Sequence, residues 1–113
     1  MNFQIIKDDF YPNICKCLNE MVPEFHSIFD DGETYPILGE FGEFIIVQKD
    51  NSKIISKCFN FINYAFETGG YETDDVIVIQ VYEQLYNIPL MDAIAKKYLK
   101  GKALEKYVKF VES

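Results

Sequence analysis

Apolar residues recur at helical spacing along most of the chain. The longest regular stripe lies between residues 51 and 67 and follows the i, i+3, i+4 positions of one helix face. It consists of Ile54, Ile55, Cys58, Phe59, Ile62, Ala65 and Phe66. Asn51 or Ser52 is available as the N-cap, and Gly69-Gly70 predicts a helix end with a left-handed residue. Fully burying a large apolar side chain is worth about 1.5–3 kcal/mol, so we expect this helix at the centre of the fold.

Shorter stripes of the same kind predict further helices on both sides of this one. Upstream, the spacing predicts a helix over residues 10–21, one or two helical turns over residues 25–29, and a third helix over residues 38–48 with an aromatic inner face. Downstream, residues 90–99 and 101–111 show the pattern of two short helices.

Residues 73–87 allow two interpretations. The β-branched run Val76-Ile77-Val78-Ile79 favours a buried strand. However, Thr73-Asp74-Asp75 is a good helix start, the helical spacing continues past the length of a strand, and a single strand would leave its backbone groups unpaired. We therefore predict a buried helix here. The whole chain, residues 1–113, is predicted to be one all-α domain, a single compact bundle of about six short helices.

Composition and charge narrow the class of protein. Of the 113 residues 49% are hydrophobic, which argues against disorder, and the formal net charge is -7. All 11 basic residues are lysines. Arginine is the usual reader of phosphates and guanine edges, and affinity for nucleic acid comes mainly from neutralised phosphates. We therefore expect no nucleic-acid partner.

The charge is distributed unevenly along the chain. From Glu20 to Glu83 there are 13 acids and 3 lysines, a balance of -10, whereas the two flanks carry 5 acids and 8 lysines, a balance of +3. Clustered carboxylates repel one another, so they are either simply solvated or complementary to a basic partner. The candidate binding carboxylates are Asp30, Asp31, Glu33, Glu40, Glu43, Glu72, Asp74 and Asp75. Tyr35 and Tyr71 are candidate anchors, because tyrosine is favoured at interface hot spots.

Catalytic and metal-binding chemistry is weakly indicated. The Asp30-Asp31-Gly32 run fails the spacing of a calcium loop, and the segment Gly39–Phe44 lacks the third glycine and the lysine of a phosphate loop. Glycines three apart on a helix instead predict the close approach of a neighbouring backbone or aromatic ring. The only histidine, His26, is expected at the surface or as a cap. We expect a protein that is not an enzyme and that holds no cofactor and no metal.

The compartment is predicted from the cysteines and the N-terminus. Cys15, Cys17 and Cys58 are an odd number and are expected to be reduced, mostly packed thiols. The N-terminus has neither the basic start nor the apolar region of a secretory signal, and no apolar run approaches the length of a membrane span. We expect a cytoplasmic protein without a membrane partner.

A resemblance extends this interpretation. Val22-Pro23-Glu24-Phe25 precedes an acidic loop, and the segment Ile37-Leu38-Gly39-Glu40-Phe41-Gly42-Glu43-Phe44-Ile45 follows it. Together with the long helix and acidic turn of residues 59–75, this order resembles a family of short bacterial all-helical domains of unknown function. Members of that family are often suspected to be immunity proteins of polymorphic toxin systems. The resemblance implies a helix over residues 73–87, a bacterial cytoplasmic setting and a binding role, and it brings no catalytic residues.

The leading functional hypothesis is an immunity-like protein that neutralises a toxin by direct binding, with a nuclease as the leading case. Nuclease active sites are basic because they bind phosphate, and an acidic helical surface matches that charge. The alternative is an interaction or homodimerisation module that uses exposed Phe and Tyr side chains. The sequence leaves the choice between monomer and homodimer open.

Overall fold

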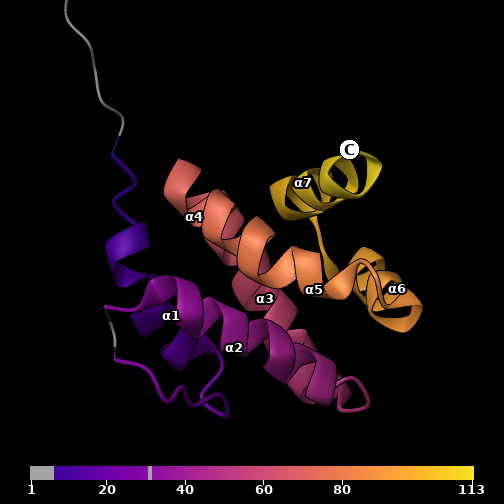
Figure 1. Cartoon of the computed structure of the whole chain (residues 1–113), viewed down its shortest axis with the longest axis horizontal. Helices are drawn as coiled ribbons and strands as arrows, with labels where there is room; N and C mark the ends of the chain where they lie inside the picture. The colour runs from indigo at the N-terminus through magenta and orange to yellow at the C-terminus, as the bar shows by residue number, and fades with distance from the viewer. Residues whose placement is uncertain (1–6, 31) are drawn as a thin grey trace, which may run out of the picture.

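A computed structural model describes residues 7–30 and 32–113, and all the regular elements within these ranges are helical. α4, the π-helical segment η2 and α5 follow one another without a break, so residues 71–85 form one helix, which we call the α4–α5 helix. With this helix counted once, six helices make up a compact globule (Figure 1), and the predicted all-α fold is confirmed. The elements are η1 (Tyr11–Asn13), α1 (Ile14–Met21), α2 (Thr34–Val47), α3 (Ser52–Thr68), α4 (Tyr71–Ile77), η2 (Val78–Tyr82), α5 (Glu83–Leu85), α6 (Pro89–Tyr98) and α7 (Gly101–Glu112).

The α3 helix lies at the centre of the bundle, as its apolar stripe predicts. Its buried residues are Ile55, Cys58, Phe59, Phe61, Ile62, Ala65 and Phe66. The helix begins at an N-cap, where Asn51 Oδ1 accepts a hydrogen bond from the backbone N–H of Ile54 at 3.3 Å. Figure 1 shows α2 and the α4–α5 helix side by side across α3, with α7 and α6 at the other end of the molecule.

The predicted helix over residues 73–87 is confirmed as far as Leu85, and residues 86–87 form a turn. The β-branched run therefore does not form a strand. Val76, Ile77, Val81, Tyr82 and Leu85 are fully buried on the inner side of this helix. The middle of this helix, Val78–Tyr82, is wound as a π-helix, which is the rare form with one extra residue per turn.

The glycines of α2 allow the α4–α5 helix to approach closely. A Cβ atom on Gly39 would come within 2.8 Å of Gln80 Oε1, and one on Gly42 would meet both the Gln84 side chain and the Gln80 carbonyl oxygen. The Gln84 side chain donates hydrogen bonds to the carbonyl oxygens of Gly39 (2.9 Å) and Gln80 (2.7 Å). The steric role predicted for these glycines is confirmed, and the neighbours are Gln80 of the π-helical segment and Gln84 of α5.

The predicted helical turns over residues 25–29 are wrong. This segment belongs to an irregular loop between α1 and α2. Phe25 is buried and packs its ring against Phe41 and Phe44 at centroid distances of 5.5 and 5.4 Å. The Ser27 hydroxyl accepts a hydrogen bond from the Phe29 N–H at 3.0 Å, and this local bond replaces a helical one.

The predicted left-handed residue at the end of α3 is also wrong. Gly69 has φ -85° and ψ 178°, which is extended backbone. A Cβ atom there would lie 2.5 Å from the Thr73 side chain, so glycine is needed because of packing. Within the described residues, the positive φ belongs to Gly101, at 55°, where α7 begins.

The α6–α7 hairpin is held by side chains from other helices, and both of its predicted helices are confirmed. Asn63 of α3 accepts from the Lys100 N–H at 2.9 Å and donates to the Tyr98 carbonyl at 3.2 Å. One turn later, Glu67 accepts from the Lys102 N–H at 3.2 Å. These bonds satisfy backbone groups at a helix start that has no cap of its own.

Candidate binding surface

Two neighbouring helices, α2 and the α4–α5 helix, carry only negative charge. They run in the same direction, because Tyr35 meets Asp75 near their starts and Gly42 meets Gln84 near their ends. Neither helix contains a lysine. Their carboxylates are Glu40, Glu43, Glu72, Asp74, Asp75 and Glu83.

A tyrosine–aspartate hydrogen bond joins the two acidic segments. The Tyr35 hydroxyl donates to Asp75 Oδ2 at 2.5 Å, across 40 positions of sequence. The hydrogen bond to Asp75, followed by burial, raises the pKa of Tyr35 to about 12, so this hydroxyl remains protonated at neutral pH. Residues from the start of α2 and from α4 therefore lie on the same side of the molecule.

Tyr11 lies at the same junction, and the sequence pattern did not indicate it. Burial raises the pKa of its hydroxyl, a hydrogen bond with Thr34 lowers it, and the nearby carboxylates of Glu72 and Asp75 raise it further. The first residues of α2 and α4 and the η1 turn thus converge on one polar cluster.

Asp8 caps the start of α4 from a distant part of the chain. The residue before α4 is Gly70, which has no side chain to cap the helix. Asp8 Oδ2 instead accepts from the Thr73 N–H at 2.8 Å, while its Oδ1 accepts from the Tyr11 N–H at 3.0 Å. Burial raises the pKa of Asp8, but hydrogen bonds from Thr73, Tyr11 and Gly70 outweigh it and leave the pKa below its usual value.

The structure brings some of the predicted binding residues together and separates others. Tyr71 is 82% exposed beside Glu72, which is also exposed. On the α4–α5 helix, Glu72 and Glu83 are exposed and Asp75 is half-buried against Tyr35. Glu43 is exposed on α2. We call the set Glu43, Glu72, Asp75 and Glu83 the acidic face.

The remaining predicted residues lie around this set or away from it. Asp30 and Glu33 are exposed in the loop before α2, and the Asp30 N–H donates to the Glu33 carboxylate at 3.3 Å. Glu40 is half-buried and accepts a hydrogen bond from Ser27. Asp74 points to α7 instead, where Lys102 Nζ lies 3.1 Å from its carboxylate. Asp31 lies outside the described residues.

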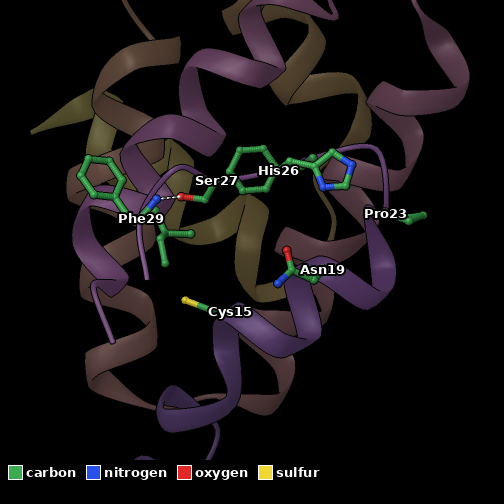
Figure 2. A pocket seen from close by; sticks show the side chains of 8 residues that line it. Cys15, Asn19, Pro23, His26, Ser27 and Phe29 are labelled. Atoms are coloured by element: carbon green, nitrogen blue, oxygen red, sulfur yellow. Dashed lines mark hydrogen bonds between the residues drawn. The ribbon is translucent and has the colours of Figure 1, made fainter. Parts of the chain in front are cut away.

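A cavity of about 250 Å³ lies between α1 and the loop that leads to α2. Figure 2 shows Cys15 and Asn19 of α1 on one side of this cavity and Ser27 and Phe29 of the loop across from them. Cys15 is buried, and its thiol lies 3.9 Å from the Thr34 hydroxyl. His26 is exposed at the rim.

The described residues contain neither a metal centre nor a membrane-spanning helix. Among residues 7–30 and 32–113, no group of three or more His, Cys, Asp or Glu side chains is placed to hold a metal ion. In the same ranges, no helix combines the length and the apolar character needed to cross a bilayer.

The fold and this surface define a small all-helical domain with one acidic side. The chain belongs to the domain family of unknown function DUF7674, whose family model matches residues 9–112. This agrees with the predicted membership of a family of unknown function. No curated protein and no solved structure shows significant similarity to the chain.

Proposed function

We propose that this chain is a binding protein that docks its acidic face onto a basic surface of another protein. The observation that carries the proposal is the charge of α2 and the α4–α5 helix, which lie side by side without a lysine. In the described part of the chain, Glu43, Glu72 and Glu83 take part in none of the ion pairs.

The physical reason is electrostatic complementarity. Exposed carboxylates that repel one another lower the stability of the folded chain, and a basic partner offsets that repulsion. Complementary potentials also steer the encounter, raising the association rate constant to about 10⁸–10⁹ M⁻¹s⁻¹ at low salt. Tyr71 supports the proposal, because an exposed tyrosine beside the carboxylates offers apolar area with a polar end.

The proposed partner is a toxin domain, with a nuclease as the leading case. A nuclease binds phosphate with a basic surface, and the carboxylates of the acidic face match that charge. The resemblance to suspected immunity proteins supports the same class of partner. Occlusion of the basic surface would neutralise the toxin without any chemical step.

The test takes a purified basic nuclease domain as the candidate partner and measures its association rate by stopped flow over a salt series. The test variant is Glu43→Gln/Glu72→Gln/Glu83→Gln. The control, Asp50→Asn/Glu105→Gln/Glu112→Gln, removes three exposed carboxylates outside the two helices. We expect the test variant to associate at least about tenfold more slowly at low salt and with a weaker salt dependence, and the control to stay within about twofold.

Two outcomes contradict the proposal. If both triple variants slow association equally, net charge and not the acidic face drives binding. If sedimentation shows a concentration-dependent dimer that is insensitive to salt, and the acidic variant leaves it unchanged, the homodimerisation alternative explains the surface better.

A further inference from the structure

The cavity between α1 and the loop has the size of a site for one side chain. Its volume of about 250 Å³ is smaller than the roughly 300–1,000 Å³ of pockets that hold cofactors and drug-sized ligands. It opens to solvent between exposed residues of both walls, including Asn19 and His26. An occupant can therefore reach it from the surface.

The floor of the cavity is apolar, while its rim is polar and carries Asn19 and His26. Phe25 and Ile37 form part of its lining, and each is only 4% exposed. The polar atoms of Ser27 and Cys15 beside them already have partners. The Ser27 hydroxyl bonds to Glu40 and to the Phe29 N–H, and the Cys15 thiol lies against Thr34. An apolar group that reaches Phe25 and Ile37 would break none of these hydrogen bonds, and the polar side chains of Asn19 and His26 lie at the exposed rim.

The wall formed by the loop is held in place before any partner arrives. Ser27 links the loop to Glu40 of α2, and Phe25 anchors it by packing between Phe41 and Phe44. Because the wall is already ordered, an occupant pays little conformational entropy to fill it.

The cavity borders the acidic surface. Ile37 lines it, and Glu40, three residues further along α2, accepts a hydrogen bond from Ser27 of the lining. Glu43 follows after another three residues. On the other edge, Phe29 of the lining is followed by Asp30 and then Glu33, both exposed. Ile28, next to Phe29, is 86% exposed and adds apolar area at this edge. A side chain entering the cavity would be flanked by carboxylates on both sides.

We propose that this cavity receives one apolar side chain of the basic partner, with lysines or arginines of the partner beside it contacting Glu40, Asp30 and Glu33. The inference rests on the proposed function, because it supplies an apolar anchor for a surface that is otherwise defined by charge. Anchors of this kind carry most of the binding energy in many interfaces.

The probe is a pair of acetylated, amidated pentapeptides with two lysines on each side of a central leucine or a central alanine. Binding is followed by ¹H–¹⁵N NMR at low salt. We expect the leucine peptide to bind about tenfold more tightly than the alanine peptide. We also expect it to shift the amide signals of Asn19, His26 and Ile37. Asn19→Trp, which fills the cavity from its rim, should abolish the difference between the peptides.

Asn60→Trp is the matched control, because Asn60 is an exposed asparagine on α3 that does not line the cavity. It should preserve the preference for leucine. Equal affinity for the two peptides, or shifts that map away from the cavity, overturns the inference. If both peptides bind equally and the acidic triple variant weakens both, the cavity inference fails while the proposed function stands. If free indole shifts the cavity amides and the leucine peptide does not, the cavity takes small molecules and the inference fails.

Discussion

The α6–α7 hairpin and the pair formed by α2 and the α4–α5 helix use their carboxylates differently. In the hairpin, Asp92 lies 3.0 Å from Lys96, and Glu105 lies 3.8 Å from Lys109. Asp92 also accepts a hydrogen bond from the buried Tyr107 hydroxyl at 2.6 Å. The hydrogen bond from Tyr107 and the contact with Lys96 outweigh burial and keep the pKa of Asp92 low.

In the other pair of helices, only half of the six carboxylates take part in packing contacts. The close contact between α2 and the α4–α5 helix depends on glycines and glutamines. Asp75 takes part in the fold through Tyr35, but Glu43, Glu72 and Glu83 remain exposed to solvent. The hairpin's carboxylates therefore serve the fold, whereas Glu43, Glu72 and Glu83 of the acidic face are available to a partner.

Truncating one carboxylate in each region tests most directly whether the two regions use their charges differently. Asp92→Ala leaves the buried Tyr107 hydroxyl without its acceptor, so we expect it to lower the free energy of unfolding by about 1–3 kcal/mol. Glu43→Ala removes an exposed helical side chain, so we expect a change within about 0.5 kcal/mol. Urea denaturation followed by circular dichroism measures both. A loss of similar size in the two variants would show that the acidic face also serves the fold.

The packing of α2 on the α4–α5 helix can be tested at its glycines. Gly42→Ala forces the Gln84 side chain from its two hydrogen bonds and crowds the Gln80 carbonyl, so we expect a net loss of about 1–2 kcal/mol despite the better helix propensity of alanine. Gly39→Ala meets only the end of the Gln80 side chain and is the matched control, with a smaller loss. Thermal unfolding compares the two, and the reverse order would contradict this packing.

The cap on α4 should give a smaller effect that depends on pH. Asp8→Ala removes the acceptor for the Thr73 and Tyr11 amides, with an expected loss of about 1 kcal/mol at neutral pH. The folded pKa of Asp8 is lowered, so this contribution is complete above the unfolded value of about 3.9 and disappears as the pH falls through the folded pKa.

The control for this prediction is Asp9→Ala, because Asp9 is exposed and adjacent. Hydrogen exchange of the Thr73 amide should become faster in the Asp8 variant and remain unchanged in the control. Unchanged exchange in both variants, or a stability difference that persists at low pH, would show that Asp8 does not cap α4.

Most of the helices could be predicted because their apolar residues recur at helical spacing, so that one face is buried in the core and the other faces solvent. The apolar stripe from Ile54 to Phe66 is enough to predict α3, because it depends only on local helix geometry and on burial of one face. The prediction of helical turns around Phe25 was wrong because the spacing of Phe25, Ile28 and Phe29 matches a buried helix face. In the structure only Phe25 of these three is buried, and Ile28 is 86% exposed. The Ser27 hydrogen bonds that fix the loop have no signature in apolar spacing.

The candidate surface was predicted less completely, because its parts meet through tertiary contacts. Tyr35 appeared as an anchor residue, but its bond to Asp75 depends on how α2 and α4 pack together. The Asp74 side chain pairs with Lys102 and not with α2, and this follows from the position of α7. The cavity lies between α1 and a loop that was predicted to be helical, so no sequence pattern indicated it.

The bond between Asp8 and the Thr73 amide spans 65 positions. During synthesis on the ribosome, Asp8 emerges early but must wait for α4 to leave the exit tunnel before it can cap that helix. The two ends of this contact therefore join late, and until then the first turn of α4, with Tyr71 and Glu72, lacks its cap.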